Sequence, residues 1–200
     1  MKIFELIIDE EDESGVDQIA LVDSPAIQSN WMAFRKQQPI DLKFQIQDEE
    51  KRIVSGYFMI ADLPIARLDD TGKVFYVVFR KDTIEKIVNK FMKNGFSSKV
   101  NLMHNSNALA EGVYVIESII VDSKRGMKAP DWAEKVPDGS WFGSMKVESD
   151  IIWNQIKQGE FRGFSVEGLF AQDREFELPE KVINKIKEVI KKYKISKKVK

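Results

Sequence analysis

Short runs in which apolar and polar residues alternate dominate the chain, and they predict strands more often than helices. The clearest runs cover residues 3–8, 40–47, 52–60, 73–79, 100–104, 112–121, 141–147 and 163–170. Alternation with a period of two places successive side chains on opposite faces of a strand. The polar stretch 48–51 between the second and third runs predicts a β-hairpin. Residues 63–72 and 122–139 are polar and contain proline and glycine, so we expect loops there.

Three other segments repeat apolar residues at helical spacing. The first covers residues 82–95, with Asp82 as its capping residue, and the second covers residues 149–159. The third covers residues 179–190, with Pro179 in the first turn, where proline is tolerated. Many strands and about three helices predict an α+β fold with a β-rich core.

The two ends of the chain differ from its middle. Pro25 keeps Ser24 out of helical geometry, so residues 15–34 predict an extended segment, either a docked arm or a substrate-like tail. The last ten residues carry six lysines. We therefore expect an N-terminal strand and extended arm (1–35), a main domain (36–176) and an amphipathic, lysine-rich C-terminal helix or tail (177–200).

Composition removes several classes of function. The chain has 200 residues, 32% of them charged, and a formal net charge of −1, so nothing draws it as a whole to nucleic acid. It has no cysteine, which excludes disulfides, thiolate metal sites and cysteine nucleophiles. A single histidine excludes a polyhistidine zinc site, and we expect no metal and no cofactor. No run has the length of a signal peptide or a membrane span, so we expect a cytoplasmic protein without membrane contact.

Ser165 and His104 are the candidate nucleophile and base. Ser165 lies in a short apolar strand between Gly163 and Gly168, and His104 is the only histidine of the chain. A serine hydroxyl needs an adjacent base, usually an imidazole, to act as a nucleophile at neutral pH. Either residue alone is more often structural, and the two glycines are also compatible with bends or close backbone approach.

A third group has to orient the imidazole. Glu117 is the first candidate, because a carboxylate in the middle of an apolar strand face needs a partner. Asp122 is the second candidate and Glu167, on the same strand face as Ser165, is the third. Lys146 is an alternative base, since a desolvated lysine can replace histidine. For the oxyanion, backbone donors or cations are available at Gly143, Gly168, Arg162 and Arg174.

Six blocks follow one another in a characteristic order. They are FYVVF (75–79), VNLMHN (100–105), GVYVIES (112–118), PDGSW (137–141), MKV (145–147) and GEFRGFSVEG (159–168). In this order the chain resembles the phage prohead, or capsid-maturation, serine proteases, most of all the branch of PBSX-type prophages. Residues 19–27 resemble the leader of that branch. The resemblance covers roughly residues 1–172, whereas the segment 179–200 matches nothing in the family.

The resemblance implies a serine endopeptidase with His104 as general base and Ser165 as nucleophile. It also implies the β-barrel surrounded by helices of the related herpesvirus assemblins. The third catalytic member varies in the wider group, so Glu117 remains an inference from the residues. Scaffold and major capsid proteins would be the substrates, with self-cleavage, inside the immature capsid in the host cytoplasm, and a homodimer is compatible with this. The alternative is a non-catalytic capsid-assembly protein that keeps the protease fold.

Overall fold

The computed structural model describes residues 3–24, 43–68, 71–133 and 135–176. The elements in these residues are β1 (Ile3–Ile7), β2 (Gly15–Val22), β3 (Gln45–Asp48), β4 (Ile53–Met59), β5 (Ile65–Leu68), β6 (Val74–Phe79), α2 (Lys81–Lys93), η1 (Phe96–Ser98), β7 (Val100–Leu102), β8 (Asn105–Leu109), β9 (Val113–Ile120), η2 (Ser123–Arg125), β10 (Trp141–Val147), α3 (Asp150–Gln158), β11 (Gly163–Leu169) and β12 (Ala171–Phe176). The predicted hairpin is present as β3 and β4, which pair antiparallel.

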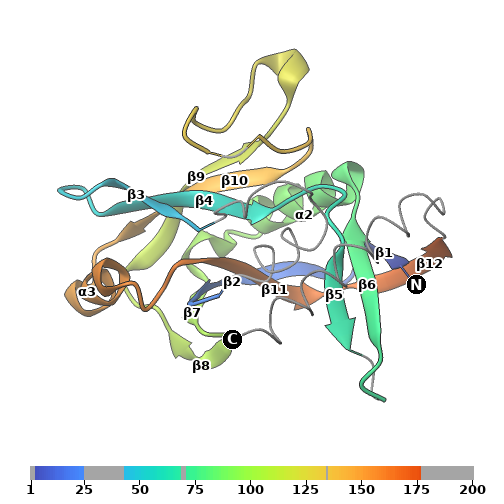
Figure 1. The fold of residues 1–200 in the computed structure, drawn as a ribbon, viewed down its shortest axis with the longest axis horizontal. Helices are drawn as coiled ribbons and strands as arrows, with labels where there is room; N and C mark the ends of the chain where they lie inside the picture. Colours follow the sequence, from blue (N-terminus) through green and yellow to red (C-terminus); the bar gives the residue numbers. More distant parts are fainter. Residues whose placement is uncertain (1–2, 25–42, 69–70, 134, 177–200) are drawn as a thin grey trace, which may run out of the picture.

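Three four-stranded sheets bring together strands that are distant in the sequence. Their orders are β12-β1-β6-β5, β3-β4-β10-β9 and β11-β2-β7-β8. In Figure 1 the sheet that contains β4 and β10 lies above the strands β2 and β11. This architecture fits the predicted β-rich α+β class. The described strands form open sheets instead of the predicted closed barrel, because each sheet ends in unpaired edge strands such as β8 and β11.

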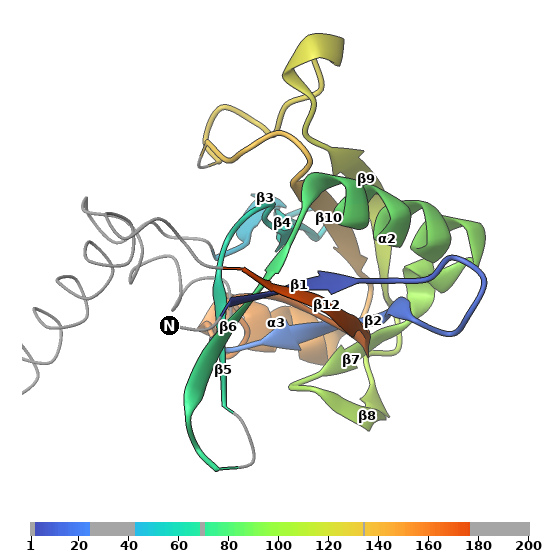
Figure 2. The same ribbon diagram turned by 90° about the vertical axis from the view of Figure 1, so that its right-hand side faces the viewer.

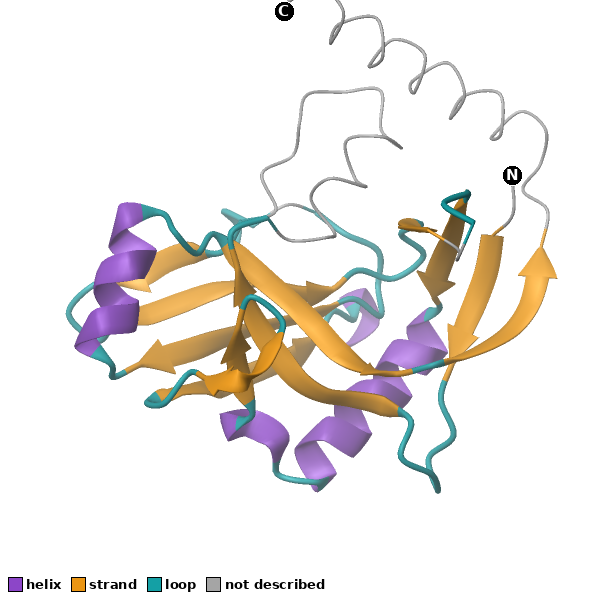
Figure 3. Cartoon of the chain, turned by 90° about the horizontal axis from the view of Figure 1, so that it is seen from below, coloured by secondary structure: helices purple, strands orange, loops and turns teal. Residues whose placement is uncertain are grey.

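Two of the three predicted helices are among the described residues, and the third, at 179–190, lies outside them. Helix α2 buries Ile84, Ile87, Val88 and Phe91, the stripe that the periodicity predicts. It begins after Arg80, one residue before the predicted region, and Asp82 lies in its first turn. The Ser149 hydroxyl caps α3 by accepting from the Ile152 N–H. Figures 1 and 3 place α3 at one end of the molecule and the β1–β12 pair at the other.

Four aromatic side chains join α2 to two of the sheets. The ring of Phe58 on β4 lies 4.9 Å from Trp141 on β10 and 4.8 Å from Phe164 on β11. Phe91 of α2 lies 5.3 Å from the same tryptophan. All four side chains are almost completely buried. This packing fixes β11, the strand of Ser165, against the sheet above it.

Tertiary pairing overrides the sequence pattern in several places. Residues 15–22 form β2, a central strand between β11 and β7, where we expected a peripheral arm. The expected loop 63–72 contains β5, which pairs with β6. The strand expected over 100–104 ends at Leu102, and the chain turns there into β8, which the pattern did not predict. Polar residues in a short edge strand give little alternation, so β8 is hard to find from sequence.

The loop 122–139 packs on a second, smaller core. This core contains Tyr57, Ile60, Leu63, Val121 and Phe142, with Ala129, Trp132, Ala133 and Val136 from the loop packed against it. In Figure 1 the loop rises above β9 and β10. It therefore covers the outer face of the β3-β4-β10-β9 sheet.

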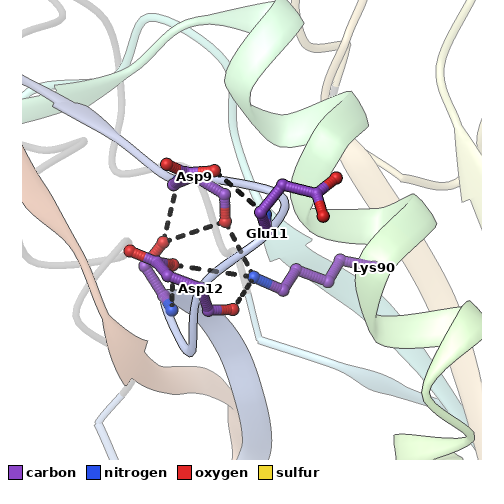
Figure 4. A network of polar contacts seen from close by, with 5 residues as sticks. Asp9, Glu11, Asp12 and Lys90 are labelled. Atoms are coloured by element: carbon purple, nitrogen blue, oxygen red, sulfur yellow. Dashed lines mark hydrogen bonds and ion pairs between the residues drawn. The ribbon is translucent and has the colours of Figure 1, made fainter.

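The acidic loop between β1 and β2 is held by two lysines of α2, of which Lys86 lies 3.6 Å from the Glu10 carboxylate. The Lys90 ammonium donates to the backbone oxygens of Asp9 and Asp12, and the first of these bonds is 2.8 Å long (Figure 4). Hydrogen bonds from Ser14 hold the pKa of Asp12 below its usual value, and the nearby Lys90 charge adds to this effect. The acidic loop is thus fastened beside the helix, as Figure 2 shows for β1, β2 and α2.

Candidate active site

The predicted nucleophile lies in a row of residues that crosses three strands. On β11, Ser165 pairs with Ala20 of β2, and Ala20 in turn pairs with Asn101 of β7. Glu167 is opposite Gln18, two positions farther along the same pair of strands. Directly paired residues and residues two apart share a face of a sheet. Ser165, Glu167 and Asn101 therefore belong to one face of the β11-β2-β7-β8 sheet.

His104 reaches this face from a tight hairpin turn. Met103 and His104 have φ angles of 55° and 60°, and they form the two-residue connection between β7 and β8. Positive φ at both positions fits a type I′ turn, a conformation that normally favours asparagine and glycine. The Met103 N–H donates to the carbonyl oxygen of Leu21 at 2.9 Å, which attaches the turn to β2. Residues held in this region of backbone space cluster at functional sites.

The imidazole of His104 contacts the carboxylate of Glu167. Nδ1 lies 2.9 Å from Oε1, and the side chains are 47% and 24% exposed, respectively. The same carboxylate oxygen accepts a 2.8 Å hydrogen bond from Nδ2 of Asn101. Because a carboxylate only accepts, Nδ1 has to carry the proton in the neutral ring. Nε2 is then the basic nitrogen, and it has no partner among the described residues.

Ser165 lies on β11 two positions before Glu167. Its side chain is partly buried, and within the described residues it makes no hydrogen bond. It also lines a cavity of about 40 Å³ together with Phe58, Arg67, Phe79 and others. Hydrogen bonds between catalytic groups are often long in the absence of substrate. A hydroxyl, an imidazole and a carboxylate on one face of one sheet can together carry out nucleophilic chemistry on a carbonyl group.

One of the two glycines around Ser165 has a packing role. A Cβ on Gly168 would lie only 1.8 Å from the carbonyl oxygen of Gly15 on β2. Only glycine allows β11 and β2 to approach so closely where the ladder is irregular, between Glu167 and Gly168. The interpretation of this glycine as a mark of close backbone approach is therefore confirmed.

Glu117, the first candidate for the third group, does not contact the imidazole in the described structure. It lies on β9, in a different sheet, and accepts a hydrogen bond from the Ser144 hydroxyl, which itself contacts the Ser55 hydroxyl at 2.7 Å. These three residues lie side by side on β9, β10 and β4 and line a cavity of about 460 Å³. Asp122, the second candidate, caps η2 by accepting from two backbone N–H groups. The carboxylate that contacts the imidazole belongs to the third candidate, Glu167.

The other predicted groups also have local partners. Lys146 lies on β10, in the sheet that carries Glu117, and donates to the carbonyl oxygen of Lys51. The guanidinium of Arg162 donates to the Gly159 carbonyl oxygen at 2.8 Å. A Cβ on Gly143 would meet the Phe58 ring at 2.3 Å, which explains this glycine by packing. Arg174 lies on β12, and its side chain is outside the described part of the structure.

Asn101 and Gln18 are members of the site that the sequence did not predict. Asn101 is completely buried, and its Nδ2 donates to Gln18 Oε1 at 2.6 Å as well as to Glu167. The available signal was the asparagine in the apolar strand 100–102, because a buried amide has to find partners. No cluster of three or more histidine, cysteine, aspartate or glutamate residues that could hold a metal occurs in the described ranges. None of the helices described is both long enough and apolar enough to cross a membrane.

Comparison with known proteins identifies a family for this chain. No curated protein and no solved structure matches the chain. A protein-family model, described as putative phage serine protease XkdF, matches residues 41–175. The match contains Ser165, His104 and Glu167 and extends over more than half of the 200 residues. The chain therefore belongs to the phage serine protease family described by the name XkdF.

Proposed function

We propose that the protein is a serine endopeptidase in which Ser165 is the nucleophile, His104 the general base and Glu167 the orienting carboxylate. The observation that carries the proposal is the 2.9 Å contact between His104 Nδ1 and Glu167 Oε1 on the strand face of Ser165. Glu167 replaces Glu117 in the third role, because β9 belongs to another sheet. The family match supports the reaction class.

The proposed reaction follows from these positions. Nε2 of His104 takes the proton of Ser165 as the hydroxyl oxygen attacks the scissile carbonyl carbon, and the imidazolium then protonates the leaving amine. Water, deprotonated by the same nitrogen, attacks the acyl-enzyme ester and releases the new carboxyl end and the free serine. Glu167 holds the ring in the Nδ1–H tautomer and stabilises the imidazolium.

We further propose that the substrates are scaffold and major capsid proteins and the chain itself, cleaved inside the immature phage capsid. This part of the proposal rests on the resemblance to the prohead proteases. The competing role is a capsid-assembly protein that has the fold but no catalysis. The orientation of His104 by a carboxylate favours the enzyme, because a purely structural fold has no need for a half-exposed imidazole held in a strained turn.

Labelling with a fluorophosphonate probe tests the reaction class without knowledge of the substrate. The full-length chain should react at Ser165, and Ser165→Ala and His104→Ala should each abolish the reaction. Ser106→Ala, a change of an exposed serine on β8, is the matched control and should label normally. Labelling that survives in Ser165→Ala at an unchanged rate would exclude the proposed nucleophile.

Coexpression with scaffold and capsid proteins tests the substrates. Mass spectrometry of the protein termini in assembled capsids should show cleavage with the parent chain and none with Ser165→Ala. If the probe labels Ser165 but the termini are identical in both preparations, the enzyme class stands and the proposed substrates do not.

A further inference from the structure

Asn101 is a polar residue in one of the most buried positions of the β11-β2-β7-β8 sheet. It lies on β7 beside Ala20 of β2 and has no exposed surface. Its Nδ2 group uses both hydrogens, one for Gln18 Oε1 at 2.6 Å and the other for Glu167 Oε1 at 2.8 Å. The Glu167 oxygen that it contacts is the same oxygen that contacts His104. The amide therefore lies directly behind the carboxylate–imidazole pair.

Among the described residues, the acceptor end of this amide has no partner. A carboxylate oxygen cannot donate, so the amide nitrogen has to face Glu167, and Oδ1 has to point away. Oδ1 is buried and has no hydrogen-bond donor among the described residues. A buried carbonyl oxygen without a donor lowers stability, whereas an apolar side chain of similar shape at this position avoids that loss. The fold alone gives no reason for an asparagine here.

We propose that Asn101 is a positioning residue for the catalytic pair, an inference that extends the proposed function. Its amide fixes one oxygen of Glu167 at the place where that oxygen accepts the proton on His104 Nδ1. The Glu167 side chain is 24% exposed, so without the amide it has room to turn toward solvent. His104 is at the tip of a hairpin and 47% exposed, and it has no other side-chain partner within the described residues. Loss of the amide should therefore release the ring as well.

The tautomer of His104 is the most direct readout of this role. The Asn101–Glu167 contact keeps the proton on Nδ1 and leaves Nε2 free to accept from Ser165. His104 is the only histidine of the chain, so the ring nitrogen signals in ¹⁵N NMR need no assignment by mutagenesis. A loss of packing alone would change stability without changing the nitrogen that carries the proton.

The experiment compares Asn101→Leu, Asn101→Asp and the control Asn107→Ala, all in the full chain with Ser165→Ala to prevent self-cleavage. Leucine has a similar shape and no donor, aspartate has the same shape and an acceptor in place of the donor, and Asn107 is exposed on β8. Spectra are recorded at about pH 9, where imidazole side chains are normally neutral. We expect the Nδ1–H form in the parent and in the control, and a shift toward the Nε2–H form in both Asn101 variants.

The same substitutions with Ser165 intact are then tested with the fluorophosphonate probe. We expect labelling to slow by about tenfold to a hundredfold in the Asn101 variants, a range typical of a displaced supporting group. The urea midpoint of Asn101→Leu should equal or exceed that of the parent. If Asn101→Leu does not fold, the isosteric Asn101→Asp decides the question.

Two results would overturn the inference. One is retention of the Nδ1–H tautomer in a folded Asn101 variant. The other is an unchanged labelling rate in such a variant while the parent labels at Ser165. If the parent does not label at all but the tautomer shifts as expected, the positioning role of Asn101 stands and the protease proposal fails.

Discussion

Glu167 and Glu117 both interrupt apolar strands, but the two sheets use these carboxylates in different ways. Glu167 contacts an imidazole at 2.9 Å, whereas Glu117 accepts from the hydroxyl of Ser144. Ser144 is 1% exposed and its hydroxyl has hydrogen-bond partners on both sides, whereas the Ser165 side chain is partly exposed and its hydroxyl makes no hydrogen bond among the described residues. A carboxylate close to a serine is thus present in both sheets. The serine, imidazole and carboxylate that we propose for nucleophilic catalysis lie in the sheet of β11.

The strongest test of this difference exchanges each carboxylate for alanine. Glu167→Ala should slow fluorophosphonate labelling about a thousandfold or more, because the ring loses its orienting acceptor and the preferred tautomer. Glu117→Ala, the matched change in the other sheet, should slow it less than about threefold, since that residue contacts no part of the proposed site. The ratio of labelling rates measures the effect. Equal losses in the two variants would remove the functional distinction between the sheets.

Ser144→Ala tests whether the hydroxyl–carboxylate row of the second sheet supports only the fold. The substitution leaves the buried Ser55 hydroxyl without its partner and should lower the free energy of unfolding by about 1–2 kcal/mol. Labelling at Ser165 should not change. Urea denaturation gives the stability and the probe gives the activity. A large loss of labelling in a stably folded variant would show that this row contributes to catalysis after all.

Lys90→Met tests a polar network that holds β2 from outside the site. Loss of the bonds to the Asp9 and Asp12 carbonyl oxygens should lower the free energy of unfolding by about 1 kcal/mol at neutral pH. The pKa of Asp12 is lowered in the fold, so its ionised form stabilises the folded state. This contribution is fully present at pH values above the ordinary carboxyl pKa of about 4.

That contribution is lost as the pH falls through the lowered pKa of Asp12, because the carboxyl group then takes up a proton in the fold as well. The Ser14 part of this contribution is the same in both proteins, so only the smaller part that comes from the Lys90 charge should reduce the stability difference between parent and Lys90→Met in acid. Urea midpoints measured from neutral pH into acid check this, with Lys93→Met in the last turn of α2 as the control. A difference that grows in acid would contradict the assigned sign.

Met103→Gly tests the strain of the turn that carries His104. Glycine adopts the φ of 55° without the clash that a Cβ brings, so stability should rise by about 1 kcal/mol. Met103→Ala keeps the Cβ and is the control. Thermal unfolding of both variants provides the comparison. No difference between them would mean that the turn is not strained in solution.

Much of the fold could be predicted from the sequence, because it depends on local periodicity. The runs at 52–60, 141–147 and 163–170 and the stripe of α2 correspond to described elements. The strands that the sequence pattern did not predict share one cause. Strands β5, β8 and β12 are short or polar, and their strand conformation comes from pairing with β6, β7 and β1, which no local pattern reveals.

Some residues of the proposed site could likewise be predicted from the sequence, whereas others became visible only in the structure. Ser165 and His104 could be chosen from residue type, uniqueness and family resemblance. The choice among carboxylates could not, because the expected position on an apolar strand face made Glu117 the first candidate, whereas its side chain is exposed in the structure. Asn101 was missed because an isolated asparagine in a three-residue strand is common in turns and edges as well.

The sequence by itself determined the composition limits, most of the long strands and helices, and the two residues proposed for nucleophile and base. The tertiary structure alone decided which acid the histidine contacts. That contact needs β11 to pair with β2, β2 to pair with β7, and the chain to reverse at Met103 and His104. Residues 104 and 167 are 63 positions apart, and only long-range strand pairing and a left-handed turn bring their side chains within 2.9 Å. Such pairings depend on the packing of the whole core, whereas periodicity reports only the local face of each strand.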